Sequence, residues 1–384
     1  MRLLFWEKAL KIHTNFLVSK FFYTITNKLL ISTMKQNNIT FKLAILVVFS
    51  FLLSINIATA QKKQYKIATI AFYNLENLFD TLDTPDKNDF EFTPQGDKKW
   101  DSKKYLSKIK NMSSVISQIG ADIAKTAPAI IGVSEIENRS VLEDLVNSPA
   151  LKKFNYKIVH YESPDRRGID VGLLYQESLF EVKNSVSARL HIDGKEDFFT
   201  RDQLLVSGEL DGDLIHIIVN HWPSRYGGEK NSRPNRNAAA DLTKSLVDSL
   251  YKIDKNSKII IVGDLNDDPI NESLMKHLKA RKTKKTTTEG ELFNTTYPLF
   301  KDGIGTLAYR DNWNLFDQMI ISYPLIDSKS GYKFYKTSVF DKDFLKRDSG
   351  RYKGYPFRTF AGGAYINGYS DHLPVYMYLI KELE

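Results

Sequence analysis

The 384-residue chain contains no cysteine. Disulfide bonds, zinc–thiolate sites and a cysteine nucleophile are therefore excluded. The chain also shows no internal repeat and no low-complexity tract. Its apolar content of 42% and its aromatic content of 12% are those of a globular protein. A chain of this length can be held together by its hydrophobic core without disulfides.

Long apolar runs are scarce, and the one that stands out is Leu43–Leu53. Two lysines precede this run, and the small-residue sequence Ala58-Thr59-Ala60 follows it. A basic start, an apolar middle and a small-x-small end are typical of a secretory signal peptide. We therefore expect residues 1–60 to be a leader that is cleaved after Ala60, and the protein to be exported to the periplasm or the extracellular space.

The leader leaves two alternatives open. Met1–Thr33 is an unusual extension in front of a signal peptide, so we expect translation to start at Met34. The segment 43–60 could almost span a bilayer as an uncleaved anchor, but the polar Ser54 and Asn56 favour cleavage. After cleavage we expect no stable membrane association and a monomer.

An excess of one charge is also missing from most of the chain. The net charge of the whole chain is +8, but residues 1–60 carry seven Lys or Arg and one Glu, which leaves a net charge of only +2 for the remainder. The overall charge therefore gives no argument for nucleic-acid binding, and any basic surface must be local.

From residue 66 onwards, apolar runs typical of buried strands alternate with amphipathic helices, most clearly at 102–119 and 235–253. Segments 204–210 and 214–219 flank a short Gly-containing turn, which predicts an antiparallel hairpin. No linker separates two domains. We predict one α/β domain over residues 61–384, with two packed β-sheets covered by helices.

A predicted buried strand, Ile259–Val262, is followed by Gly263 and then by Asp264, Asn266, Asp267 and Asp268. The carboxyl ends of strands are where open α/β sheets build their sites, although a polar turn explains this cluster equally well if it is taken alone. Five other segments place similar side chains at the end or the start of a predicted strand, which favours a site. They carry Asn74, Glu135, His221, Asp317 and the pair Asp371-His372.

This oxygen-rich set of side chains, which has no thiolate, is suited to a hard divalent cation. Glu135, assisted by Asn74 and Asp371, would supply the protein ligands of Mg²⁺ or Mn²⁺, with Ca²⁺ as the alternative. Such an ion would polarise a phosphoryl oxygen and offset the charge that develops on it. Glu137 competes for the same role, but Glu135 is preferred because it follows the strand directly.

The remaining side chains suggest how water would be activated. Asp264 is the candidate general base. His372 could bind a phosphate oxygen or orient the water, and Asp317 would fix the tautomer of His372 and hold it charged. His221 could bind phosphate or help the leaving oxygen depart.

These segments, in this order, resemble the endonuclease/exonuclease/phosphatase superfamily, which includes pancreatic-type deoxyribonucleases, abasic-site nucleases, inositol-phosphate phosphatases and bacterial sphingomyelinases. The resemblance covers nearly all of residues 66–380. It implies a four-layer α/β sandwich, with two mixed β-sheets packed face to face and flanked by helices, and divalent-metal hydrolysis of a phosphoester. The matching segments are Tyr73-Asn74, Ser134–Arg139, Arg167–Tyr175, Asn220–Arg225, Gly263–Asp267, Phe316–Gln318 and Ser370–Pro374.

The resemblance also implies roles for single residues. Asn74, Glu135 and Asp371 would lie at the metal, and Asp317 would pair with His372. The implied roles of the others are contact with phosphate for His221 and Asn266, activation of water for Asp264, and a position near the substrate for Arg201.

Some residues near these motifs have a simpler explanation. Arg225 could bind a flanking phosphate together with Arg233 and Arg236, but a solvated helix start is nearly as good an explanation. Asp267 and Asp268 are better explained as turn or helix-cap residues. The histidines that lack a motif are interpreted as surface or core residues; they are His160, His191, His216 and His277.

Three classes of function remain: a nuclease, a phosphatase or phospholipid phosphodiesterase on the same scaffold, and a non-catalytic binding protein. The last is the weakest, because nearly every expected catalytic position is filled. We favour a secreted nuclease that hydrolyses DNA or RNA, since arginines and aromatic residues around the site suit a polyanion. The exposed apolar hairpin expected of a sphingomyelinase is not evident.

Overall fold

The computed structural model describes residues 63–328 and 330–383, together with Leu46 and Phe49. The chain divides into two compact units, Met1–Lys63 and Gln64–Glu384. The predicted signal peptide, its cleavage site and the expected start at Met34 fall outside the described residues, apart from Leu46 and Phe49. Among the described residues, no helix combines the length and the apolar character needed to cross a membrane.

The second unit is built around two mixed sheets of six and seven strands, ordered β14-β17-β1-β2-β4-β3 and β5-β6-β7-β8-β13-β10-β9. The first contains β1 (Tyr65–Leu78), β2 (Ile130–Ile136), β3 (Tyr156–His160), β4 (Asp170–Gln176), β14 (Lys333–Val339) and β17 (Val375–Glu382). The second contains β5 (Phe180–Ala188), β6 (Gln203–Leu210), β7 (Asp213–His221), β8 (Lys258–Asp264), β9 (Ala280–Arg281), β10 (Leu292–Asn294) and β13 (Asp317–Ser322).

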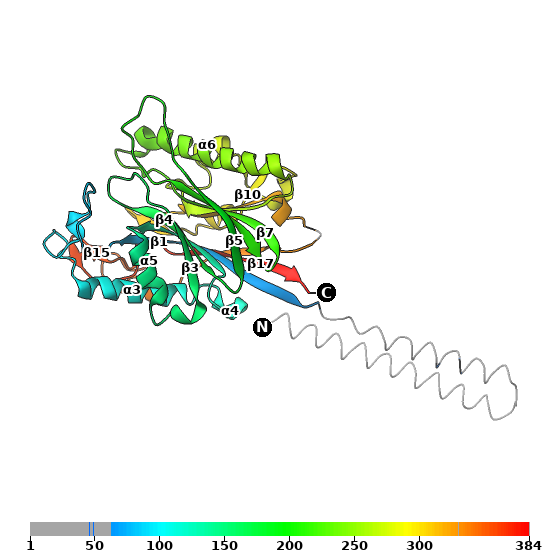
Figure 1. The fold of residues 1–384 in the computed structure, drawn as a ribbon, viewed down its shortest axis with the longest axis horizontal. Helices are drawn as coiled ribbons and strands as arrows, with labels where there is room; N and C mark the ends of the chain where they lie inside the picture. The colour runs from blue at the N-terminus through cyan, green and yellow to red at the C-terminus, as the bar shows by residue number, and fades with distance from the viewer. Residues whose placement is uncertain (1–45, 47–48, 50–62, 329, 384) are drawn as a thin grey trace. The chain divides into compact units, whose positions relative to one another are not determined.

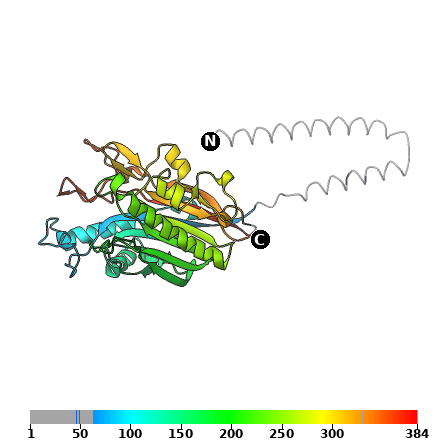
Figure 2. The ribbon, with the colours of Figure 1, turned by 90° about the horizontal axis from the view of Figure 1, so that it is seen from above.

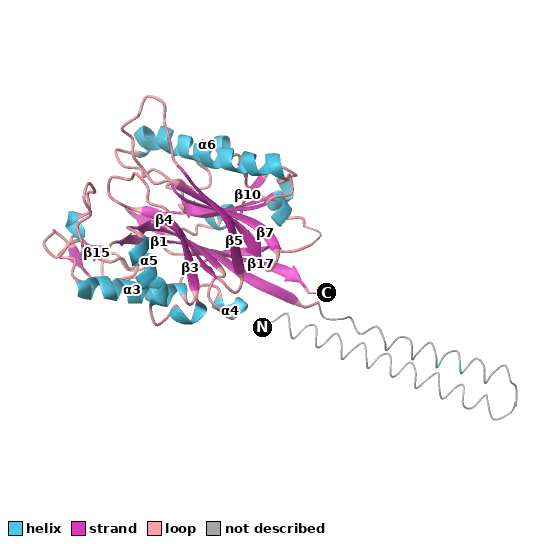
Figure 3. Ribbon diagram, viewed as in Figure 1, coloured by secondary structure: helices cyan, strands magenta, loops and turns pink. Residues whose placement is uncertain are grey.

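Helices cover the outer face of each sheet (Figures 1 and 3). The first sheet is covered by α3 (Ser102–Ile116) and α5 (Arg139–Asn147), and the second by α6 (Glu229–Ile253). Figure 2 shows α6 running along the strands that it covers. The order helix, sheet, sheet, helix confirms the predicted four-layer α/β sandwich.

Short elements complete the unit. Two of them, β11 (Leu307–Tyr309) and β12 (Asn312–Asn314), form a hairpin whose turn is Arg310-Asp311. Both turn residues have positive φ, as the tight turns of hairpins require. Besides β11 and β12, the short helices and strands include α4 (Ala121–Ala124), α7 (Tyr297–Lys301), β15 (Phe360–Ala361) and β16 (Ala364–Tyr365).

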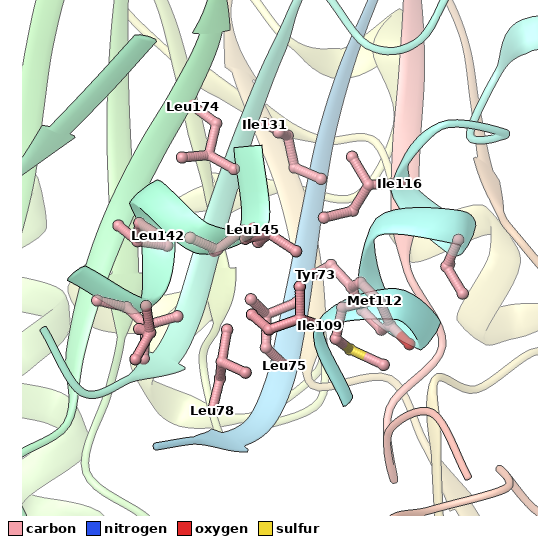
Figure 4. Packing of buried hydrophobic residues seen from close by; sticks show 14 of the residues in the cluster. Tyr73, Leu75, Leu78, Ile109, Met112, Ile116, Ile131, Leu142, Leu145 and Leu174 are labelled. Atoms are coloured by element: carbon pink, nitrogen blue, oxygen red, sulfur yellow. The ribbon is translucent and has the colours of Figure 1, made fainter. Parts of the chain in front are cut away.

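The core consists of three hydrophobic clusters: one between the two sheets and one beneath the helices on each outer face. A strand that is buried on both faces has an unbroken run of apolar residues in its sequence, and Ile259–Val262 in β8 is such a run. Its alternate side chains point to the two faces: Ile260 and Val262 pack between the sheets, while Ile259 and Ile261 pack under α6. A third cluster packs α3 and α5 onto the first sheet, with Met112 and Leu145 facing Tyr73 and Ile131 (Figure 4).

One helix differs from its prediction. We predicted α6 to begin at Asn235, but it begins at Glu229 and includes Pro234. A proline inside a helix lacks the N–H for one backbone hydrogen bond and crowds the preceding turn. Arg236, two residues after the proline, donates to the backbone oxygens of Ser224 and Glu229 and so ties the start of α6 to the preceding loop.

Candidate active site

Strand register brings three of the predicted site residues together on the second sheet. His221, at the end of β7, is directly opposite Asp264 at the end of the parallel strand β8. Asp264 is in turn opposite Asp317, the first residue of the antiparallel strand β13. Residues directly opposite each other in a sheet project to the same face, so three strands present these side chains side by side.

His372 joins this row from the segment before β17. Its Nδ1 lies 2.7 Å from Asp317 Oδ2, and its Nε2 lies 3.9 Å from Asp264 Oδ2. Burial acts to lower the pKa of His372, but the carboxylates of Asp317 and Asp264 outweigh burial and raise that pKa well above its usual value. His372 is therefore held as a cation that carries an N–H at Nε2.

His221 has the opposite electrostatic environment. Burial, together with the positive charges of Arg201 and Arg167, lowers the pKa of His221 well below its usual value. Its Nε2 lies 3.6 Å from Asp264 Oδ2 and its Nδ1, which is buried, has no hydrogen-bond partner among the described residues. His221 is therefore a neutral imidazole whose Nε2 faces the carboxylates of Asp264 and Glu135.

Asp264 lies at the centre of the site and is almost fully buried. Its carboxylate accepts hydrogen bonds from Asn74 Nδ2 at 3.2 Å and from the backbone N–H of Asn266 at 3.0 Å. Burial raises the pKa of Asp264 to about 7; the charge of His372 opposes this rise, and that of Asp317 adds to it. A carboxylate with such a pKa can exchange protons near neutral pH.

Glu135 and Asn74 reach the site from the first sheet through irregular backbone. The β2–β4 register shifts between Ser134 and Ile136, and Glu135 between them has φ of +57°. Its Oε1 accepts from Asn74 Nδ2 at 3.2 Å, and its Oε2 accepts from the Asn77 N–H at 3.0 Å. Bulges that re-aim one side chain are common next to active sites, and this one turns Glu135 toward His221, whose Nε2 is 3.8 Å from Glu135 Oε1.

A divalent cation fits the chemistry of this cluster. Glu135, His221 and Asp264 each offer a ligand atom, and these atoms lie within 4.8 Å of one another. The nitrogen of His221 that faces the two carboxylates is Nε2, at 3.8 Å from Glu135 Oε1 and 3.6 Å from Asp264 Oδ2, and two carboxylates with a neutral imidazole form a donor set that a divalent ion can use. Asn74 contacts two members of this cluster, whereas Asp371 lies outside it.

Asp371 forms the rim of the site within a chain of charges that our sequence analysis missed. Arg358 Nη2 donates to Asp371 Oδ2 at 2.8 Å, and Arg358 Nε donates to Glu76 Oε1 at 3.1 Å. Glu76 is also 3.5 Å from the ammonium of Lys108, which is buried in α3. Lys108 could have been suspected, because it interrupts the apolar face of a predicted helix. Arg358 is one of the arginines that we expected around the site, but its pairing with Glu76 and Asp371 was not predicted.

Arg201 and Asn266 lie beneath His221. Arg201 Nη2 and Asn266 Nδ2 both donate to the carbonyl oxygen of Trp222, at 2.6 and 3.0 Å. Arg201 is also paired with Asp165 at 3.1 Å and is buried. Both side chains therefore hold the chain that follows His221, and their predicted contacts with substrate stay predictions.

Arg225 lies against the loop after β8. Its Nε donates to the Asn266 carbonyl oxygen at 2.9 Å, its guanidinium lies 4.4 Å from the centre of the Phe316 ring, and it pairs with Asp267 at 3.1 Å. Asp267 is fully buried and also pairs with Arg236 at 2.8 Å, so it anchors α6 to this loop and does more than form a turn.

Glu137 faces away from this cluster. Its carboxylate accepts from the Asp80 N–H at 2.6 Å and from the Thr84 hydroxyl at 3.0 Å. The structure therefore places Glu135, and not Glu137, beside the other predicted site residues.

Solved structures with the same fold as this chain are known, although they share little sequence identity with it. No curated protein matches the chain. In solved structures, a TDP2 from D. rerio carrying 14 humanising mutations matches with a TM-score of 0.51, 10% identity, and coverage of 82% of this chain and 99% of the other. A truncated TDP2 from Caenorhabditis elegans matches with a TM-score of 0.51, 14% identity, and coverage of 82% and 97%. These similarities show the fold.

The family assignment comes from the sequence itself. Residues 69–381 match the profile of the endonuclease/exonuclease/phosphatase family, and this span includes every element from β1 to β17 that supplies the candidate site. The chain therefore belongs to the endonuclease/exonuclease/phosphatase family.

Proposed function

We propose that this protein is a divalent-metal-dependent nuclease that hydrolyses phosphodiester bonds of DNA or RNA. Members of its family are phosphoric ester hydrolases. The observation that carries the choice of a diester is a pair of basic hollows that adjoin different parts of the candidate site. A phosphodiester in a nucleic acid has groups on both sides of the scissile phosphate and can use both hollows, whereas a phosphomonoester extends on one side only.

The first hollow is lined by Arg166, Arg167 and Arg201, with Tyr226 at its edge. Through Arg201 it reaches the Trp222 carbonyl, next to His221 in the chain. The second hollow includes Arg358, which pairs with Asp371. Arginines with exposed aromatic rings between them are typical of surfaces that bind a phosphate backbone and its bases.

Two histidines of opposite protonation state would divide the binding of the phosphate. His372, held as a cation by Asp317, would donate from Nε2 to a non-bridging phosphate oxygen. His221, which is neutral, would donate or accept a single hydrogen bond at the same phosphate. The hydrogen bond from Asp317 keeps the proton of His372 on the ring and fixes its orientation.

Asp264 would act as the general base. Water attacks phosphorus, its proton passes to the Asp264 carboxylate, and the bond between phosphorus and the leaving oxygen breaks. A divalent cation held at Glu135, with Asn74 and Asp371 nearby, would polarise the phosphoryl oxygen. Asn74 would orient both carboxylates, because its amide donates to Glu135 and to Asp264.

The substrate class can be tested with the purified protein in Mg²⁺ or Mn²⁺ and then in EDTA. The substrates are plasmid DNA, RNA, bis(p-nitrophenyl) phosphate, p-nitrophenyl phosphate and sphingomyelin. We expect hydrolysis of the nucleic acids and of the small diester, and its loss in EDTA. Activity that survives chelation would contradict the metal dependence, and selective hydrolysis of the monoester or of the lipid would contradict the nuclease.

The site itself can be tested by substitution. Asp264→Ala and His372→Ala should each lower kcat by about 10²–10⁴-fold, the range for loss of acid–base groups. His277→Ala is the matched control, because His277 pairs with Asp241 at 2.9 Å on the surface, far from any predicted role. Full activity in either site variant would contradict the assignment.

We further propose that the protein is exported, on the evidence of the basic, apolar and small-residue pattern that ends at Ala60. A protein that works outside the cytoplasm would meet free nucleic acid as its substrate. Its freedom from cysteine is compatible with an oxidising compartment.

A further inference from the structure

The second hollow has a composition that the proposed chemistry does not use. It has a volume of about 300 Å³ and lies between the β11–β12 hairpin and the segment 347–366. Besides Arg358, three arginines and three tyrosines line it: Arg310, Arg347 and Arg351, with Tyr309, Tyr352 and Tyr355. Four of these six side chains lie in irregular segments, where binding residues are most often found.

The arginines of the hollow carry charge that the protein does not neutralise. None of the three forms an ion pair with a carboxylate of the described residues, whereas Arg358 deeper in the hollow is paired with both Glu76 and Asp371. The single acid in the lining, Asp311, accepts a hydrogen bond from the Tyr355 hydroxyl at 2.6 Å. The hollow therefore presents a net positive charge to an incoming anion.

The tyrosines of the hollow are exposed in an unusual way for large aromatic side chains. Tyr309 is 61% exposed and Tyr352 is 49% exposed. Arg310 lies 5.2 Å from the ring of Tyr309, and Arg351 lies 5.7 Å from the ring of Tyr352. Each pair is a planar ring beside a guanidinium, which can accept a stacked base and an adjacent phosphate together.

The hollow is continuous with the candidate active site through one residue. Arg358 lines the hollow, and its guanidinium donates to Asp371 Oδ2 at 2.8 Å. A ligand in the hollow that reaches Arg358 would therefore lie next to Asp371, at the rim of the candidate site. A volume of about 300 Å³ lies at the lower end of ligand pockets and suits one nucleotide unit.

We propose that this hollow is a subsite for the nucleotide next to the scissile phosphodiester, with the base stacked on the tyrosines and its phosphate paired with Arg310, Arg347 and Arg351. The subsite rests on the nuclease proposed above and makes it more specific. Recognition by stacking and by phosphate contacts requires unpaired bases, so the substrate at this point is a single strand or a frayed end.

The test compares two diesters that differ in whether they can fill the hollow. The full chain and the double variant Arg351→Ala/Tyr352→Ala are assayed with a single-stranded oligonucleotide and with bis(p-nitrophenyl) phosphate, which lacks a neighbouring nucleotide. The ratio of kcat/KM for the oligonucleotide to kcat/KM for the small diester should fall about 10-fold or more in the variant, as expected for loss of one stacked base and one phosphate contact. Lys284→Ala/Lys285→Ala, on an exposed loop outside the hollow, is the control and should leave the ratio unchanged.

A binding measurement separates failure of the subsite from failure of the nuclease. Fluorescence anisotropy of a labelled oligonucleotide is recorded in EDTA for both proteins, and the Kd of the variant should be about 10-fold weaker. If wild type cleaves the oligonucleotide and the variant keeps the same ratio and the same Kd, the subsite is contradicted and the nuclease stands. If wild type binds the oligonucleotide more tightly than the variant but cleaves neither diester, the subsite is supported and the nuclease is contradicted. If wild type does not bind the oligonucleotide, the subsite is contradicted.

Discussion

At the scale of single residues, the site depends on one buried pair that sets the charge of a histidine. Asp317 is 1% exposed and accepts from His372 at 2.7 Å. It therefore acts on the substrate only through His372, as a positioning residue.

Asp317→Asn should lower activity by about 10–100-fold, because the amide cannot hold the imidazole as a cation. The change in the charge of His372 can be measured directly, because an NMR titration should give a lower pKa for its ring in the variant than in wild type. Asp241→Asn, which alters the surface pair with His277, is the matched control and should change neither quantity at the active site. An unchanged pKa of His372 in Asp317→Asn would contradict this role.

A second histidine predicts how stability depends on pH. His216 in β7 lies with its Nδ1 2.7 Å from the Ser207 hydroxyl, and burial lowers its pKa below the usual value. The folded protein thus binds a proton at His216 less readily than the unfolded chain does, so this contribution to stability is complete above a pH of about 6.5 and is lost as the pH falls below it.

His216→Gln removes that dependence. We expect the free energy of unfolding of wild type, relative to the variant, to decrease as the pH falls from 7.5 to 5. Urea denaturation at the two pH values measures this difference. If the difference in free energy of unfolding between wild type and variant stays constant or grows as the pH falls, the pKa of His216 is not lower in the folded protein than in the unfolded chain.

Residue chemistry was also where the sequence was most informative. Asp264, His372, His221 and Asp317 could be predicted because each stands at a strand terminus beside a distinctive neighbour, and the structure brings them together. The pairing of Glu76 with Lys108 could not be predicted, because it joins a strand end to a helix that lies elsewhere in the sequence.

At the scale of elements, α3 is tied to the rim of the site by a charge inside its apolar face. Lys108 is 1% exposed; its ammonium donates to Thr359 Oγ1 at 2.6 Å and to the Tyr369 carbonyl oxygen at 2.5 Å, and it faces Glu76. Removing one partner from such a buried group leaves the others without their charge or donor.

Lys108→Met should therefore lower the free energy of unfolding by about 3–5 kcal/mol. Lys108→Met/Glu76→Gln should recover part of that loss, because the second change removes the unpaired carboxylate. Lys110→Met, an exposed position of the same helix, should stay within about 0.5 kcal/mol of wild type. Urea denaturation of the three variants checks this order, and equal losses for Lys108→Met and Lys110→Met would contradict it.

The β7–β8 pairing is a second element whose geometry serves the site. β8 continues through Gly263 to Asp264, and a Cβ at Gly263 would lie 2.3 Å from the backbone oxygen of Asn220. A glycine is required here because the backbones approach closely, immediately before Asp264, the proposed general base.

Gly263→Ala should push β7 and β8 apart, lower stability by about 1–3 kcal/mol as overpacking does, and reduce activity by displacing Asp264. Gly290→Ala is the control, since a Cβ there meets no atom within 4 Å. It should cost stability through its positive φ but leave activity unchanged. Thermal unfolding and diester hydrolysis measure the two effects, and normal activity in Gly263→Ala would show that Asp264 tolerates the shift.

At the scale of the whole molecule, the layered fold could be predicted, but its irregular parts could not. The alternation of apolar runs and amphipathic helices was sufficient to predict two sheets covered by helices. The segment 341–368, which supplies Arg358 and four of the six side chains of the proposed nucleotide subsite, has no periodicity to interpret. Its conformation is set by contacts with α3 and with the strand ends, so it could be placed only with the fold in hand.

The way the second unit begins leads to a prediction about the leader. β1 starts at Tyr65 and pairs with β17 from Tyr65↔Glu382 onwards, so every described strand pair of the second unit lies after residue 64. Cleavage after Ala60 would leave a short extension and the complete strand. We therefore expect N-terminal sequencing to show that the protein, if it is exported as proposed, begins at Gln61. We also expect the fragment 61–384 to unfold within about 2 °C of the full chain.

A fragment 71–384 lacks the first six residues of β1, which pair with Met377–Glu382, and should unfold at least about 10 °C lower or fail to fold. Equal unfolding temperatures of the two fragments would mean that the first six residues of β1 contribute little to stability. An N-terminal residue other than Gln61 would mean that cleavage occurs elsewhere.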